Sequence, residues 1–315
     1  MSDHPVPSGR ARELVQRAYD THVHIAPDVM ERRTDDVSLA HRFAAVGMAG
    51  FVLKSHYVPT AERAEVVRGV VPGVDVLGAL TLNGSVGGFN PVAVEIAGRQ
   101  GAKVVWFPTV DGLNQRESRA AAPKGATPPM WAQLQDDLAA EGIIAPAIAV
   151  LDEAGALLPE VHSVLKVIAK HDMVLATGHL SEREIIAVVD ASADAGVRRI
   201  VVTHPEFTSQ QLSVDVQKHL AERGTLLERC FTTPHSGKIS WEFLFDHIRA
   251  VGPEYSILSS DLGQPFNPPV EDGLALMADK LLGAGFSEAE VQVMAVRNSR
   301  RIAAPAHATN TASAA

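Results

Sequence analysis

Short runs of β-branched and other apolar residues alternate along the chain with longer segments whose apolar residues recur at helical spacing. Such alternation is typical of parallel strands joined by crossover helices. It predicts eight strands, near residues 18–25, 50–55, 75–82, 102–108, 173–179, 199–204, 225–230 and 255–261. Helices are predicted between and after them, among others at 36–46, 91–101, 182–196, 210–223, 242–251, 272–282 and 288–302.

Several of these helices carry start and stop signals. Ser181 with Glu184, and Ser287 with Glu290, have the spacing of a capping box. A glycine, which often ends a helix in the left-handed conformation, follows four apolar-periodic stretches, at Gly47, Gly101, Gly196 and Gly224. Eight strand–helix units in 315 residues predict a (β/α)₈ TIM barrel of the α/β class.

The segment between the fourth and fifth predicted strands is longer than the others. Residues 111–171 form an insertion that we expect to be a lid or a flank of the barrel. Within it lie a loop rich in Pro, Ala and Gly at 120–129, a helix around 131–141, apolar segments around 143–151 and a helix around 159–169. Residues 1–302 are predicted to form a single domain, and 303–315, which lack periodicity, a disordered tail.

Composition narrows the class of protein. Hydrophobic residues make up 46% and charged residues 21%, which is ordinary globular usage and excludes a disordered or coiled-coil chain. The net charge is −9 without a dense basic cluster, so a nucleic-acid partner is not expected. One cysteine, Cys230, cannot form an internal disulfide, and the N-terminal residues lack the apolar stretch of a signal peptide, so we expect a cytoplasmic protein. No apolar run reaches the ~20 residues of a membrane helix, so we also expect it to be soluble.

Histidines gather where the predicted strands end. His22 and His24 lie two residues apart at the end of the first strand, a spacing that directs both imidazoles to one side. His179 and His204 end the fifth and sixth strands, and Asp261 ends the eighth. The carboxyl ends of barrel strands meet at one mouth, and imidazole and carboxylate groups suit a divalent transition metal. The alternative is a hydrogen-bonded polar layer without a metal.

In this order, the five residues resemble the signature of the metal-dependent amidohydrolase superfamily. That signature is His-x-His on the first strand, single histidines ending the fifth and sixth, and Asp ending the eighth, and the resemblance spans 19 to about 302. Phrases at 54–56, 83–91, 106–109 and 261–264 are similar to a functionally uncharacterised branch of it. The resemblance implies that His22 and His24 hold a metal, with Asp261 as a ligand and general base. His179 and His204 would hold a second ion, or divide between ligation and orienting the attacking water.

The fourth strand departs from the two-metal form of the signature. There a carboxylated lysine or a glutamate bridges the ions, whereas residues 104–109 read VVWFPT and offer no such group. On the second strand, Lys54 and His56 have the two-residue spacing that points both side chains into the mouth. Lys54 either replaces the bridge or remains an unmodified cation that orients a substrate oxyanion. The alternative for both residues is a hydrogen bond or an ion pair at the rim.

Four residues are predicted to contact the substrate: His56, Arg33, Asn83 and Trp106. Arg33 follows the first strand, and its forked guanidinium suits an anionic group, although such a run is commonly a solvated loop. Asn83 opens a glycine-rich loop after the third strand. Trp106 is expected to line the pocket. Glu228 and His235 receive no role, and Cys230 is expected to be buried and inert.

These residues predict a metal-dependent hydrolase. Asp261 would deprotonate a water that attacks the carbonyl of a small amide, lactone or ester, with His204 and Lys54 as further catalytic residues. A lyase or decarboxylase on the same scaffold, and a barrel that binds metal or ligand without catalysis, are the alternatives. Zinc leads as the ion, one or two per chain, ahead of manganese, iron, cobalt and nickel. The expected partners are a small-molecule substrate and a second copy of the chain in a homodimer.

Overall fold

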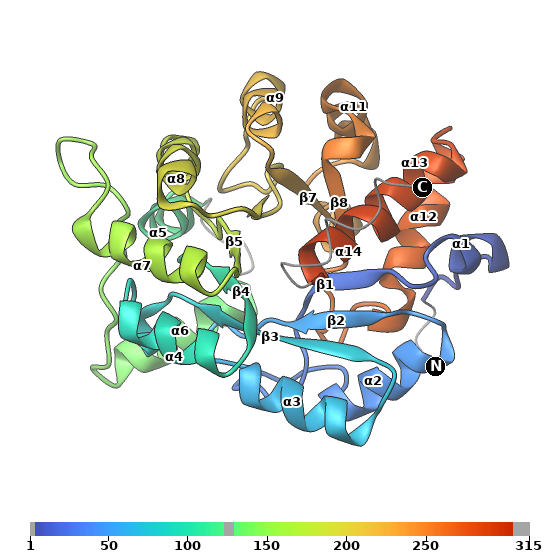
Figure 1. The fold of residues 1–315 in the computed structure, drawn as a ribbon, viewed down its shortest axis with the longest axis horizontal. Helices are drawn as coiled ribbons and strands as arrows, with labels where there is room; N and C mark the ends of the chain where they lie inside the picture. The colour runs from blue at the N-terminus through green and yellow to red at the C-terminus, as the bar shows by residue number, and fades with distance from the viewer. Residues whose placement is uncertain (1–3, 123–128, 305–315) are drawn as a thin grey trace.

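The computed structural model describes residues 4–122 and 129–304, and it confirms the predicted barrel. Eight parallel strands follow one another around the sheet in chain order, and the helices lie outside them (Figure 1). The strands are β1 (Tyr19–Val23), β2 (Gly50–Leu53), β3 (Asp75–Thr81), β4 (Ala102–Trp106), β5 (Val174–Ala176), β6 (Ile200–Val202), β7 (Leu226–Cys230) and β8 (Ser256–Ser259). A parallel bridge between Val23 and Leu262 joins the first strand to the segment after the last.

The helices include the crossover connections and short terminal pieces. They are α1 (Gly9–Leu14), α2 (Asp36–Ala45), α3 (Ala61–Val70), α4 (Pro91–Arg99), α5 (Leu113–Ala120), α6 (Met130–Ala140), α7 (Pro159–Lys170), α8 (Glu182–Ala195), α9 (Val214–Glu222), α10 (Thr232–His235), α11 (Trp241–Val251), α12 (Gly273–Gly283), α13 (Glu288–Gln292) and α14 (Asn298–Ala303). Single turns are η1 (Gly84–Val86), η2 (Pro253–Tyr255), η3 (Val270–Asp272) and the π-helical η4 (Val293–Arg297). Within the described residues, none of these helices has the length and apolar character needed to cross a membrane.

The local signals in the sequence act as predicted. Both capping boxes form, at Ser181 with Glu184 and at Ser287 with Glu290. The four helix-ending glycines have φ between 76° and 85°, in the left-handed region. The predicted helix 210–223 begins later, at Val214, because Ser213 caps it and the residues before it form a loop. The predicted helix 288–302 is interrupted by the π-helical turn η4.

The insertion after β4 is more helical than predicted. Helices α6 and α7 match the predicted segments, but α5 was not expected, because its polar sequence has no clear apolar period. Most of the predicted loop 120–129, at 123–128, lies outside the described residues, as do residues 305–315 of the predicted tail.

The core consists of layers inside and outside the strands. Apolar side chains that fill the barrel include Val52, Ala79, Val104, Trp106, Val174, Ala176, Val201 and Ile257. Two larger clusters lie between the strands and the surrounding helices. Because side chains alternate along a strand, the next inward positions beyond this apolar filling face the barrel mouth. At the end of β2, Lys54 and His56 follow Val52 at this spacing, whereas His179 and His204 come three residues after Ala176 and Val201, in the loops beyond β5 and β6.

Candidate metal centre

Strand β1 and the segment after β8 bring three of the predicted metal ligands together. Nε2 of His22 and Nε2 of His24 each lie 3.2 Å from Oδ1 of Asp261. The three ligand atoms all lie within 4.8 Å of one another. Both histidines are almost completely buried, and Asp261 borders a cavity. The arrangement could accommodate one ion between two nitrogens and an oxygen.

The backbone holds Asp261 in an uncommon conformation. Its φ is 53°, in the left-handed region that few residues other than glycine adopt. Its amide donates to the carbonyl of His22 (2.8 Å), and the hydroxyl of Thr232 donates to Oδ2 (3.0 Å). Gly263 follows with φ 135°, and a Cβ there would lie 1.5 Å from the carbonyl oxygen of His24. The strain and the close approach both serve to fix the carboxylate beside the two histidines.

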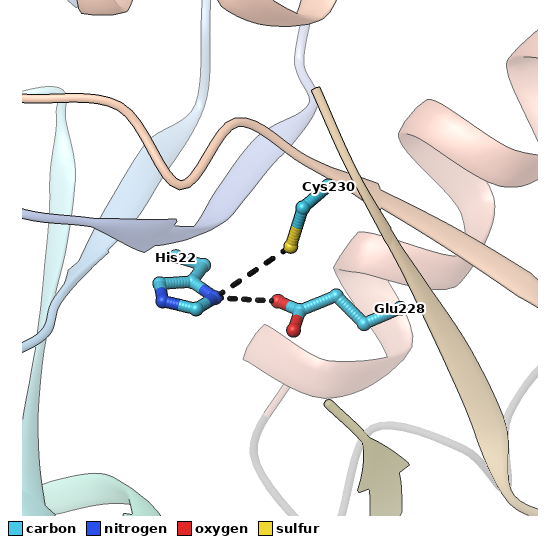
Figure 2. Close-up of side chains that lie close together, drawn as sticks. All are labelled: His22, Glu228 and Cys230. Atoms are coloured by element: carbon cyan, nitrogen blue, oxygen red, sulfur yellow. Dashed lines mark hydrogen bonds and ion pairs between the residues drawn. The ribbon is translucent and has the colours of Figure 1, made fainter. Parts of the chain in front are cut away.

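Glu228 orients His22 through the other ring nitrogen, Nδ1, and Figure 2 shows the two side chains facing each other. Nδ1 of His22 donates to Oε1 of Glu228 (3.1 Å), and the hydroxyl of Ser259 donates to the same oxygen (2.9 Å). Burial alone would raise the pKa of Glu228, but its interactions with His22, His204 and Lys54 hold it at about 2. A carboxylate that binds Nδ1–H keeps the lone pair on Nε2, the ring nitrogen that lies beside Asp261.

Cys230 completes a second group of side chains that could hold a metal, with His22 and Glu228 (Figure 2). Its Sγ lies 3.9 Å from Nδ1 of His22. Burial, together with the carboxylates of Glu228 and Asp261, raises the pKa of the thiol well above its usual value. Without a bound ion the group is therefore a protonated thiol. Because Glu228 binds Nδ1 of His22 while Nε2 lies beside Asp261, we interpret Glu228 as support for His22.

His179 and His204 lie across the same mouth, farther from the carboxylate. Their ring centroids are 5.0 Å apart, and the ring of His204 is 6.1 Å from that of His22. Burial lowers the pKa of both, to about 3 for His204, so both imidazoles are neutral. Among the described residues, Nδ1 of His179 has no hydrogen-bond partner. Their roles as ligands of a second ion or as groups that orient water remain predictions.

Lys54 and His56 both face the mouth from the end of β2. The ammonium of Lys54 donates to Nε2 of His22 (2.9 Å) and lies 5.1 Å from the ring centroid of Trp106. Burial lowers the pKa of Lys54. His56 stacks on His24 with 4.8 Å between ring centroids, and its Nδ1 is 2.9 Å from the hydroxyl of Thr109. Burial also lowers the pKa of His56 well below its usual value.

A cavity of about 640 Å³ opens above these residues. Its walls come from the loops after the strands and from helices α5 and α6, so the insertion contributes to the pocket. His56 and Lys54 line it, together with His24, His179, His204 and Asp261.

Three predicted substrate contacts are not among the residues that line this cavity. Arg33 donates instead to the carbonyls of Pro265 (2.9 Å) and Asn267 (2.7 Å), and its neighbour Arg32 takes the place at the wall. Asn83 is fully buried and binds the backbone of His56 and Thr109. Trp106 fills the barrel below the pocket. None of the three lines this cavity, and their contact with a substrate stays a prediction.

The fold is a (β/α)₈ barrel whose mouth is lined by His24, His179 and His204, and it is shared with solved amidohydrolases of low sequence identity. Similar solved structures include an amidohydrolase from Pseudomonas aeruginosa (11% identity, TM-score 0.56, 93% of this chain and 98% of that chain covered). The probable dipeptidase PvdM from the same organism matches at 11% identity and TM-score 0.57, covering 93% and 96%. An amidohydrolase from Burkholderia multivorans with bound zinc matches at 12% identity and TM-score 0.54, covering 91% and 99%. The predicted resemblance to the amidohydrolase superfamily is thus confirmed at the level of the fold.

The chain belongs to a family of unknown function, DUF6282, whose model matches residues 17–228. A comparison with curated proteins gives no match. The matched range contains His22, His24, Lys54 and Glu228, whereas Asp261 follows it. The family assignment therefore leaves the reaction open, and the chemistry has to be argued from the site.

Proposed function

We propose that this protein is a metal-dependent hydrolase that cleaves an amide, lactone or ester bond in a small molecule. The observation that carries the proposal is the group of His22, His24 and Asp261, whose ligand atoms lie within 4.8 Å of one another at a cavity. Hydrolases and lyases share such scaffolds, so the reaction has to be separated by experiment.

The donor set fits a transition metal. Two imidazole nitrogens and one carboxylate oxygen are ordinary ligands of zinc, and Glu228 holds His22 in the tautomer that ligation needs. Nδ1 of His24 is buried and has no partner in the described part of the chain. We propose zinc first, because this donor set suits it and because a structurally similar amidohydrolase contains it. A divalent ion held there would supply Lewis acidity toward a carbonyl oxygen and lower the pKa of a water.

The protein's own groups would move the proton. The two histidines and Lys54 hold the pKa of Asp261 well below its usual value although burial opposes them, so Asp261 is a carboxylate before substrate binds. It would accept a proton from the attacking water and return it to the leaving group. Lys54, in its unmodified form, would bind the oxyanion that develops on the substrate. His204 would orient the water.

Turnover in ¹⁸O-labelled water tests the reaction class. A panel of small lactones, esters and amides is incubated with the metal-loaded protein, and products are analysed by mass spectrometry. We expect one labelled oxygen in the product carboxylate for each turnover. Release of carbon dioxide from a carboxylated compound without incorporation of label would instead establish a lyase.

Replacing His22 tests the metal centre. Elemental analysis of purified His22→Ala should show a loss of at least about half an equivalent of transition metal relative to wild type, because one of three ligands is gone. His41→Ala, at an exposed histidine of α2, is the matched control and should keep the wild-type content. Equal metal content in the three proteins would contradict the assignment.

Glu228→Gln tests the support for His22. The amide keeps the shape of the side chain but removes the negative charge that stabilises Nδ1–H, so we expect metal affinity to fall about tenfold. Competition with a chromophoric chelator measures this affinity. Glu242→Gln, on the exposed face of α11, should leave it unchanged. An unchanged affinity in Glu228→Gln would show that the contact is only structural.

A further inference from the structure

The cavity above the candidate metal centre is bordered by positive charge. Four of its lining residues are basic: Arg32, Lys54, Arg119 and Lys238. Within the described residues, Asp261 is the one carboxylate of the lining. The whole chain, by contrast, carries a net charge of −9. The local charge of the pocket is therefore opposite to that of the protein, which favours an anionic ligand.

The four cations differ in how far they are neutralised. Arg32 pairs with Asp28 at 2.8 Å, and Arg119 pairs with Asp136 at 2.5 Å. In the part of the chain that the structure describes, neither Lys54 nor Lys238 forms an ion pair with a carboxylate. Lys54 lies at the buried floor, where its ammonium is bound to His22. Lys238 is thus the unpaired cation toward the outer part of the cavity.

The position of Lys238 is fixed by an aromatic side chain. It follows α10, in the loop after β7, and its ammonium lies 4.2 Å from the ring centroid of Phe207. Phe207 in turn packs on His204, with 4.8 Å between the ring centroids. This cation–π contact holds the charge over the pocket without neutralising it. Burial lowers the pKa of Lys238 while Asp261 raises it, so the ammonium interacts electrostatically with the carboxylate of Asp261.

Apolar side chains form the rest of the wall. Those that line the cavity include Met30, Met130, Trp131, Phe207 and Phe266. Small-molecule sites typically combine such surfaces with a few polar groups in volumes of about 300–1,000 Å³, and this cavity of about 640 Å³ falls in that range. A ligand that matches it has an apolar or aromatic body and an anionic substituent.

We propose that Lys238 binds a carboxylate of the substrate, so that the protein acts on small carboxylic acids whose reacting group faces the metal centre. A single ammonium matches the single charge of a carboxylate. The identification of this ligand as a substrate rests on the proposed hydrolase function, whereas the binding of the carboxylate does not require catalysis. Lys238 is then a residue that determines specificity.

Isothermal titration calorimetry with matched probes tests this proposal. Isophthalate and terephthalate are each compared with the monoamide in which one carboxylate is replaced by a carbamoyl group of the same shape. We expect zinc-loaded wild type to bind at least one dicarboxylate about tenfold more tightly than its monoamide. Lys238→Gln should lose that preference and bind the monoamide as wild type does, and Lys238→Arg should retain it. Lys218→Gln, at an exposed position of α9, is the matched control.

The same titrations with chelator-treated protein separate this proposal from the proposed function. Wild type should still bind the dicarboxylate more tightly than Lys238→Gln does when the metal has been removed, even if no hydrolysis is ever found. A dicarboxylate preference that survives in Lys238→Gln would overturn the proposal. So would wild-type protein that binds both dicarboxylates no more tightly than their monoamides, or that binds neither.

Discussion

Asp261→Asn should lower kcat/KM for hydrolysis about a thousandfold. Asparagine keeps an oxygen that accepts the hydroxyl of Thr232, so the conformation after β8 should survive. It removes the basic oxygen that faces His22 and His24, and general base catalysis typically contributes about 10²–10⁴ in rate. Initial rates are measured at matched metal occupancy on the substrate found by isotope labelling, so that loss of the base is distinguished from loss of the ion.

The control for this variant is Asp246→Asn, which changes the same charge at an exposed position of α11. It should have the wild-type rate. If Asp261→Asn also keeps the wild-type rate, the carboxylate is not the base. If the wild-type protein hydrolyses no compound while it retains metal, the barrel that binds without catalysis becomes the better account.

Strand positions were predictable because their geometry is periodic. Side chains two residues apart on a strand point to the same face. Once the strands were placed, the pair His22 and His24 therefore had to share one face, as did the pair Lys54 and His56. Parallel strands in a closed sheet end at one mouth, which brought Asp261 to them from the other end of the chain. Neither step required knowledge of the loops.

The same rule would have found Glu228. It lies between Leu226 and Cys230 on β7, and all three share one face. Leu226 belongs to the interior of the barrel, so the charged residue two positions later had to face inward as well. A carboxylate that faces the inside of a barrel needs a partner, and His22 was the available candidate.

Loop residues could not be placed in this way. Arg32 and Arg33 are adjacent, but they lie after β1, where no period relates one side chain to the next. The backbone carbonyls of Pro265 and Asn267 capture Arg33, and these residues are more than 200 positions away in the sequence. Asn83 was assigned to the pocket by its neighbourhood in sequence, whereas its amide group holds the loops after β2 and β4 together. The orientation of a loop side chain depends on hydrogen-bond partners that only the folded structure brings close.

One residue beyond Glu228, the chain carries a buried ion pair on the other face of β7. Arg229 is fully buried and pairs with Glu206, in the loop that follows His204. Its guanidinium also donates to Oε1 of Gln217 (2.8 Å) and to the hydroxyl of Ser256 (3.1 Å). Burial lowers the pKa of Arg229 to about 9, which still leaves it charged at neutral pH. The ion pair of Arg229 and Glu206 therefore holds the loop that follows His204 against strand β7 of the barrel.

Arg229→Leu should lower the free energy of unfolding by about 3–5 kcal/mol, because it leaves the carboxylate of Glu206 buried without its cation. Urea denaturation followed by circular dichroism measures the change. Arg223→Leu, which breaks a half-exposed pair with Asp190, should cost at most about 1 kcal/mol. The double variant Arg229→Leu with Glu206→Leu should recover part of the loss, since no unpaired charge remains. A single variant as stable as the Arg223 control would mean that Glu206 takes up a proton or reaches water, and that the loop after β6 is held by its other contacts.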